Sequence, residues 1–177
     1  PSGWHDYEGG LAHGKTTKHK TDGSVEAADL IDKHNYSKYP NMFPINSRRA
    51  SFLGEFGGIG CRIDGHMWTN KTWGYGGTDK VNDLAWSQNR FIDLMNHVAK
   101  LSYSGLAGCV YTQTTDVEAE NNGLITYDRK VIKFNVAALR EVHEKVRKYA
   151  EHASVAYKLK VLAPRLDPSP KAWAWTV

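Results

Sequence analysis

Glu55 has the residue type and the setting that nucleophilic or acid–base chemistry needs. It stands near the end of the apolar segment Ala50-Ser-Phe-Leu-Gly-Glu-Phe56, which is typical of a strand and is broken by Gly57-Gly58. An ionised carboxylate beside apolar side chains is costly unless partners hold it. A Glu held in that way can attack an electrophilic carbon or transfer a proton. The alternative interpretation is a structural Glu that is bonded to an Arg or to a helix N-terminus.

A second candidate segment is the polar block, residues 113–130, which follows the apolar run Gly105-Leu-Ala-Gly-Cys-Val-Tyr111. It is rich in side chains that form hydrogen bonds: Gln113, Asp116, Glu118, Glu120, Asn121 and Asn122. A buried strand that opens into carboxylates and amides is typical of the active-site rim of an α/β barrel. A solvated polar loop has the same composition and is the alternative.

A Gly-rich segment between these two, the aromatic loop (residues 65–77), contains Trp68, Trp73 and Tyr75. Flat aromatic faces held in a loop suit stacking on sugar rings or on apolar ligands. Trp68 and Trp73 are therefore candidate substrate-binding residues. A loop that packs on its own aromatic side chains is equally consistent with the sequence.

The elements that must position these residues alternate in type along the chain. Hydrophobic periodicity predicts strand, strand, helix, strand and helix at about 28–34, 50–56, 80–101, 105–112 and 136–152. Asp79 and Asn135 are the expected N-caps of the two helices. This order predicts an α/β fold with parallel strands. Three strands are too few for a closed barrel, which needs eight, so we expect the last part of a barrel.

Composition narrows the function classes. With 41% hydrophobic and 24% charged residues, the chain is typical of a soluble globular protein, and no apolar run reaches the roughly 18 residues of a membrane span. The net charge of +4 is small and scattered, without the basic helix face or aromatic strands of a nucleic-acid-binding module. Cys61 and Cys109 lack metal-site spacing. Nothing else in the sequence indicates a metal or another cofactor, so none is expected. A free thiol is the default for Cys109, and a disulfide between the two stays open.

Four segments resemble, in order, the (β/α)8 catalytic domain of glycoside hydrolase family 2, the β-galactosidase and β-glucuronidase family. They are Ser2-Gly-Trp-His-Asp6, Asp29-Leu-Ile-Asp-Lys-His-Asn-Tyr36, Leu53-Gly-Glu-Phe-Gly-Gly-Ile-Gly60 and the stretch Val110 to Lys130. The resemblance implies that the three strands are about the sixth, seventh and eighth of a TIM barrel. Residues 1–162 would then be the C-terminal part of that catalytic domain, and residues 163–177 a linker and the start of a following domain.

The resemblance also implies roles for individual residues. The family's catalytic nucleophile, the Glu that ends the seventh strand, falls on Glu55. Substrate-binding roles fall on His34 and Tyr36 after the sixth strand, on Gln113 and Asp116 past the eighth, and on Trp4, with Asp6, near the end of the fifth.

One part of the family's pattern is absent from this sequence. Its acid/base Glu belongs to an Asn-Glu pair that ends the fourth strand, and no Asn-Glu dipeptide occurs here. Retaining hydrolysis needs a second carboxyl group roughly 5–5.5 Å from the nucleophile. Glu118 and Glu120 are poor substitutes, because a polar loop does not maintain the raised pKa that an acid catalyst needs.

The sequence therefore predicts a fragment of a retaining exo-acting β-glycosidase, β-galactosidase-like, that hydrolyses terminal β-linked sugars. The remaining barrel strands would come from the same chain or from another, and this chain alone would be inactive. Two alternatives stay open: a non-catalytic carbohydrate-binding or assembly remnant of the same fold, and an unrelated two-layer α/β module that binds a polyanion. We expect a carbohydrate partner and neither a nucleic acid nor a membrane partner; the compartment and the sugar are not encoded in any motif.

Overall fold

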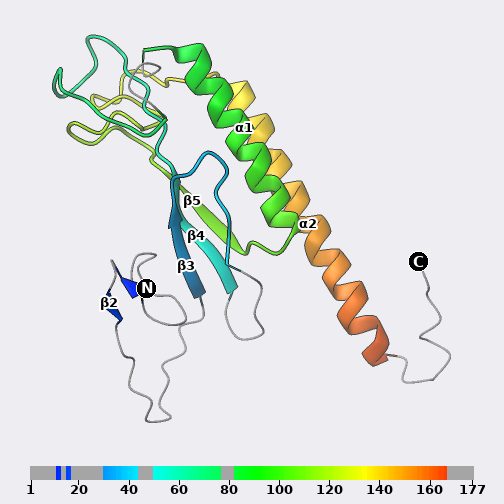
Figure 1. Cartoon of the computed structure of the whole chain (residues 1–177). Coiled ribbons are helices and arrows are strands. Elements are labelled where there is room, and N and C mark those ends of the chain that lie inside the picture. The colour runs from blue at the N-terminus through cyan, green and yellow to red at the C-terminus, as the bar shows by residue number, and fades with distance from the viewer. Residues whose placement is uncertain (1–10, 13–14, 17–29, 44–49, 77–81, 167–177) are drawn as a thin grey trace.

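The computed structural model describes residues 11–12, 15–16, 30–43, 50–76 and 82–166. Trp4, Asp6, Asp79 and the predicted segment after Leu166 lie outside the described residues. The chain forms two short strands, a three-stranded sheet and two helices (Figure 1). Their bounds are β1 (Leu11–Ala12), β2 (Lys15–Thr16), β3 (Leu30–Asn35), β4 (Ala50–Gly57), α1 (Leu84–Tyr103), β5 (Gly108–Thr112) and α2 (Val136–Leu166).

The larger sheet has the order β3-β4-β5, and both of its strand pairs are parallel. This confirms the predicted α/β class and the parallel arrangement. The carboxyl ends of the three strands meet at one edge of the sheet, where loops rather than helices follow β3 and β4. That edge carries most of the residues that the sequence singled out.

The two helices lie side by side on one side of this sheet (Figure 1). Fully buried side chains of β4 and α1 form the centre of the core: Leu53, Phe56, Phe91, Leu94 and Val98. Each of these contributes about 1.5–3 kcal/mol through burial. Val142 of α2 joins the same cluster, so one core holds the sheet and both helices together.

An irregularity in β4 decides where Glu55 points. Between Phe52 and Glu55 the strand advances three residues while β3 advances two, and between Leu53 and Phe56 it again has one residue more than β5. Leu53 and Phe56 both belong to the core, although a regular strand would place them on opposite faces. This β-bulge turns Glu55 out of the helix-side core.

The starts of α1 and β5 differ from the sequence prediction, and the start of α2 agrees with it. Helix α1 begins at Leu84, because Asp83 caps it by accepting a hydrogen bond from the Trp86 amide at 2.8 Å. Strand β5 begins only at Gly108. Helix α2 begins as expected, with Asn135 Oδ1 accepting from the Ala138 amide at 3.0 Å.

Helix α2 is longer than predicted, since it continues past residue 152 to Leu166. No Gly or Pro occurs between 153 and 163 to stop it, and most residues there are good helix formers. The helix takes in Pro164, in its last turn, and with it the start of the predicted linker. The proposed division at residue 163 stays a prediction. No helix of the described residues is both long and apolar enough to cross a membrane.

Candidate active site

Glu55 lies at the carboxyl end of the central strand with its carboxylate partly open to solvent. Its side chain is 40% exposed. Oε2 accepts a hydrogen bond from the Tyr36 hydroxyl at 2.5 Å and lies 3.2 Å from Nδ1 of His34. Among the described residues, Oε1 has no hydrogen-bond partner. One carboxylate oxygen is therefore held in place while the other is available.

His34 is itself positioned by Asp32 on the same strand. Its Nε2 lies 3.4 Å from Asp32 Oδ2, and both side chains are 9% exposed. Asp32 Oδ1 accepts from the amide of Gly54 at 2.8 Å. A Cβ at Gly54 would lie 2.3 Å from that same carboxylate, so only glycine fits there. The bulge of β4, Asp32 and His34 thus form one bonded arrangement beside Glu55.

Tyr36 connects Glu55 to the third strand and to the aromatic loop. Its hydroxyl lies 3.3 Å from Thr112 Oγ1, at the end of β5. Its ring stacks on Tyr75 with centroids 4.1 Å apart and planes 13° from parallel. Burial, reinforced by the hydrogen bond to Glu55, raises the pKa of Tyr36 well above its ordinary value. The phenol is therefore neutral and acts as a hydrogen-bond donor to the carboxylate.

Gln113 follows Thr112 directly, but its side chain turns into the polar block. Its Nε2 donates to Glu120 Oε2 at 2.9 Å and to Asn122 Oδ1 at 2.8 Å. Glu120 is thereby engaged, and Glu118 is exposed with a left-handed backbone, φ 50°. Neither carboxylate contacts the cluster around Glu55, in the part of the chain that the structure describes.

Asp116 occupies the interior of the polar block. Its Oδ1 accepts from Lys133 Nζ at 2.6 Å and from the Gly123 amide at 2.8 Å, and its side chain is 5% exposed. Burial raises the pKa of Asp116 and lowers that of Lys133, while their contact opposes both shifts. Instead of lining a pocket beside Glu55, as the resemblance implied, this carboxylate neutralises a buried cation.

Lys133 is not among the residues that the sequence predicts for the site. Its ammonium group, fully buried, also donates to the carbonyls of Cys61 at 2.6 Å and Asn121 at 3.0 Å. It therefore joins the polar block, through Asp116 and Asn121, to the chain segment at Cys61 that leads into the aromatic loop. The only signal for it was a lysine flanked by the apolar Ile132 and Phe134.

The two candidate tryptophans have different surroundings. Trp73 is bonded through its backbone to Ala119 and Asn121 of the polar block, and its ring meets Tyr75 edge-on at 5.8 Å. Trp68 packs against Tyr127 at 4.9 Å. Trp73 thus reaches Glu55 through Tyr75 and Tyr36, whereas Trp68 belongs to the far side of the polar block.

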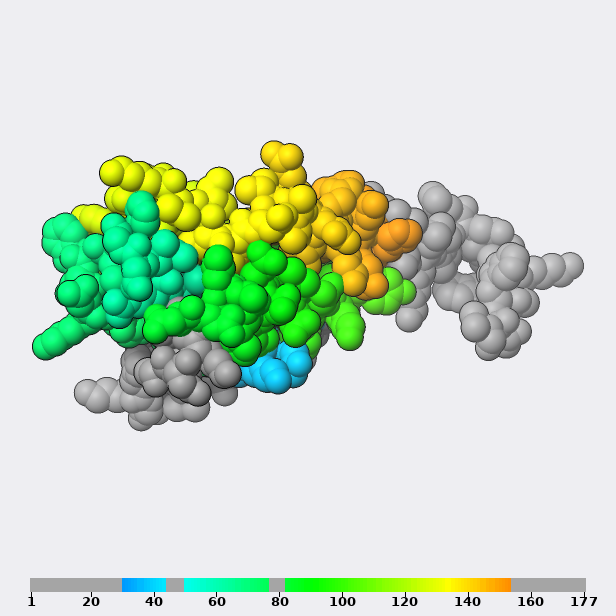
Figure 2. Space-filling view, turned by 90° about the horizontal axis from the view of Figure 1, so that it is seen from above, coloured from blue at the N-terminus to red at the C-terminus, as the bar shows by residue number. Residues whose placement is uncertain are grey.

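The aromatic loop, the polar block and the start of α1 form one continuous surface at this end of the molecule. Figure 2 shows them as adjoining teal, yellow and green regions. Parallel bridges join Ile59 to Tyr75 and Trp73 to Glu120, so these loops are held by backbone pairing. Loops that a scaffold positions around a strand-end carboxylate are typical of binding sites.

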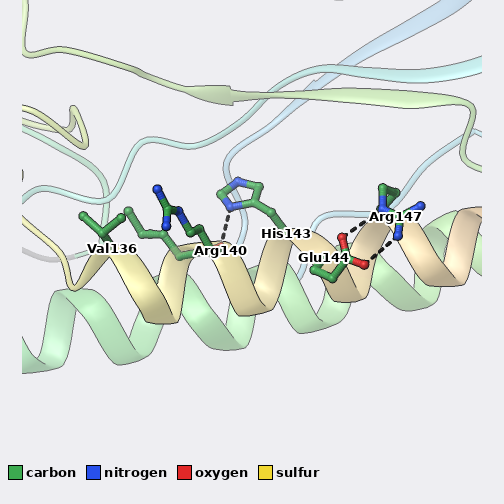
Figure 3. Close-up of a pocket in the computed structure, with 6 residues that line it drawn as sticks. Val136, Arg140, His143, Glu144 and Arg147 are labelled. Atoms are coloured by element: carbon green, nitrogen blue, oxygen red, sulfur yellow. Dashed lines mark hydrogen bonds and ion pairs between the residues drawn. The ribbon is translucent and has the colours of Figure 1, made fainter.

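A surface hollow lies on α2, away from the cluster around Glu55. It has a volume of about 560 Å³ and is lined by α2 residues alone, among them Arg140, His143, Glu144 and Arg147 (Figure 3). Arg147 pairs with Glu144, and His143 Nδ1 donates to the Leu139 carbonyl one turn earlier. These contacts lie within a single helix, and among the described residues no other element brings a second wall of functional groups to them.

Within the described ranges, no group of three or more His, Cys, Asp or Glu side chains is arranged to hold a metal ion. Cys61 and Cys109 are both free thiols, so the disulfide left open by the sequence is not formed. Burial raises the pKa of each thiol, which disfavours the reactive thiolate. Comparison of the sequence with models of known protein families and with curated proteins finds no match in either set.

Proposed function

We propose that Glu55 is the nucleophile of a retaining exo-acting β-glycosidase, β-galactosidase-like, and that this chain contributes the C-terminal part of its (β/α)8 catalytic domain. The observation that carries the proposal is the convergence of all three strand ends on one carboxylate. His34 of β3 and Tyr36, just after β3, both contact Glu55 of β4, whose Oε1 is available. Thr112, which ends β5, contacts the Tyr36 hydroxyl. In parallel α/β folds, catalytic groups are built at this edge.

The geometry suits nucleophilic attack by Oε1 on an anomeric carbon. The hydrogen bond from Tyr36 orients the carboxylate, which reduces the freedom that must be lost before reaction. A glycosyl ester would form at Glu55, and water would later cleave it with overall retention. His34 lies beside the carboxylate, and the exposed rings of Tyr75 and Trp73 are connected to it through Tyr36; in this proposal these groups contact the sugar.

The proton donor must come from elsewhere. Glu120 is bonded to Gln113, and Glu118 has no described contact with the cluster around Glu55. Among the described strands, β5 pairs only with β4, so its other edge is open. An open strand edge is a template for pairing with a further strand. We propose that further strands, from this protein or a second chain, supply the acid/base carboxyl group.

The proposal is tested by trapping the glycosyl ester in the complete protein. A 2-deoxy-2-fluoro β-glycoside with a good leaving group should label the enzyme, and peptide mass analysis should place the label on Glu55. Glu55→Gln should lower the rate of aryl β-galactoside hydrolysis by about 10⁴-fold or more, as loss of a nucleophile does. Glu118→Gln is the matched control, because that carboxylate is exposed, and it should retain activity.

A label on another carboxyl group, or a Glu55→Gln variant with undiminished turnover, would disprove the assignment. The non-catalytic alternative is favoured by one observation, the absence of a second free carboxylate near Glu55 among the described residues. It predicts that the complete protein binds sugar, is not labelled by the fluoro-glycoside, and releases no aryl alcohol at any pH.

A further inference from the structure

A cleft lies behind Tyr36, on the helix side of the sheet edge. It has a volume of about 360 Å³, at the small end of the range for ligand pockets. Its aromatic wall is made by Tyr36, Tyr75 and Trp86, and its polar wall by Asn89, Arg90 and Asp93 of α1. Glu55 does not line it, so the cleft is separate from the space in front of that carboxylate.

Arg90, which lines the cleft, has incomplete hydrogen bonding. Its Nη2 donates to the Lys38 carbonyl, and its guanidinium lies over the Tyr39 ring at 5.7 Å. Its Nη1 is buried and has no acceptor in the part of the chain that the structure describes. Buried donors of this kind are rarely left without a partner, since the lost hydration is costly. Because Arg90 lines the cleft, a small turn of its guanidinium would bring this donor to an oxygen atom of a bound molecule.

The other lining groups define the chemistry of that molecule. Asp93 and Asn89 stand three and one residues from Arg90 on α1, so the acidic side chain lies on the same helix face as the guanidinium. A carboxylate beside a guanidinium suits a hydroxyl group, which accepts from one and donates to the other. Asp93 disfavours an anion, and Arg90 with Lys38 disfavours a cation. The rings of Trp86 and Tyr75 offer apolar faces to C–H groups.

We infer that this cleft is a second binding site, for a neutral polyhydroxylated small molecule of monosaccharide size. The inference does not depend on hydrolysis at Glu55. The two sites nevertheless share a wall, because Tyr36 lines the cleft with its ring and holds Glu55 with its hydroxyl.

The test is a titration of the ¹⁵N-labelled protein with D-galactose, followed through the indole N–H resonance of Trp86. Trp86→Phe assigns that resonance. We expect a saturable shift, and Asp93→Asn should weaken the affinity about tenfold, the loss expected for one hydrogen bond to a charged group. Asp64→Asn is the matched control, because Asp64 is another exposed aspartate and is paired with Arg62; it should leave the affinity unchanged. Glu55→Gln keeps an acceptor for the Tyr36 hydroxyl, so it should weaken the affinity less than Asp93→Asn does.

Three results would overturn the inference. A Trp86 shift that is lost in Glu55→Gln but kept in Asp93→Asn would place the sugar in front of Glu55. Tighter binding of acetate than of galactose would show an anion site at Arg90. No saturable shift up to the solubility limit of galactose, in a protein with a well-dispersed spectrum, would show that the cleft binds no sugar. None of these results bears on whether Glu55 forms a glycosyl ester, which the fluoro-glycoside tests separately.

Discussion

Replacing Lys133 by methionine should strongly destabilise the protein. The lysine side chain is completely buried, and its ammonium group makes three contacts of 2.6–3.0 Å, with Asp116 and with two backbone carbonyls. Methionine fills a similar volume but leaves the Asp116 carboxylate buried without a counter-charge. Breaking a buried ion pair from one side costs about 3–5 kcal/mol. Asp116 keeps its bond from the Gly123 amide, which places the expected loss toward the lower figure.

A double-mutant cycle separates the ion pair from the loss of packing. Asp116→Asn alone leaves the ammonium group with two carbonyl acceptors and no carboxylate, and should also destabilise the fold. In the double variant Lys133→Met/Asp116→Asn no buried charge remains. It should therefore be more stable than the sum of the single losses predicts, by about 0.5–3 kcal/mol, the range of coupling between contacting groups.

The assay is equilibrium unfolding in urea of the four proteins in the cycle, with Lys130→Met as control. Lys130 is 74% exposed at its side chain and lies 4.0 Å from Asp128, so its removal should cost less than about 1 kcal/mol. A Lys133→Met variant within about 0.5 kcal/mol of the parent, a typical surface effect, would refute the reasoning. The reasoning would also be refuted if the double variant lost as much stability as the two single variants together.

Three further predictions follow from individual contacts. Asp83→Ala should destabilise the protein by about 1 kcal/mol in urea unfolding, because α1 loses its N-cap. The hydrogen bond from His66 holds the pKa of Asp128 at about 2, so His66→Ala should raise the NMR titration midpoint of that carboxyl toward its usual 3.8. Since this pKa is depressed by folding, its stabilising effect is full above about pH 4 and disappears as the pH falls toward 2. Gly57→Ala should lower the free energy of unfolding in urea for two reasons. The left-handed backbone at φ 89° costs roughly 1–2 kcal/mol for a residue with a Cβ. The clash of that Cβ with the Tyr111 ring costs ~1–3 kcal/mol more.

The parallel sheet and the location of Glu55 at a strand end were predictable from the sequence. Both depend on local features, namely apolar runs, their spacing, and the glycines that end β4. The N-terminus of α1 was predicted four residues early, because Val81 fits the helical periodicity and Asp79 is as good a cap as Asp83. Local sequence cannot choose between two such caps.

Asp116 and Lys133 show what the sequence could not predict. A carboxylate in a stretch of polar residues has the pattern of a solvent-exposed group, and its partner lies 17 positions later in the chain. Only the folding of the polar block onto the segment at Cys61 buries both charges together. The same holds for Tyr36, whose stacking on Tyr75 joins residues 39 positions apart.

The extra residue in β4 has a consequence for how Glu55 is held under the proposed function. The Gly54 amide donates to Asp32, whose carboxylate lies beside His34, the neighbour of Glu55. Deleting Gly54 would restore regular pairing, with Phe52 and Glu55 two residues apart as Asp32 and His34 are, so Glu55 would keep its face and its place opposite His34. Asp32 would lose that amide donor, so the deletion would loosen His34 without moving Glu55 along the sheet.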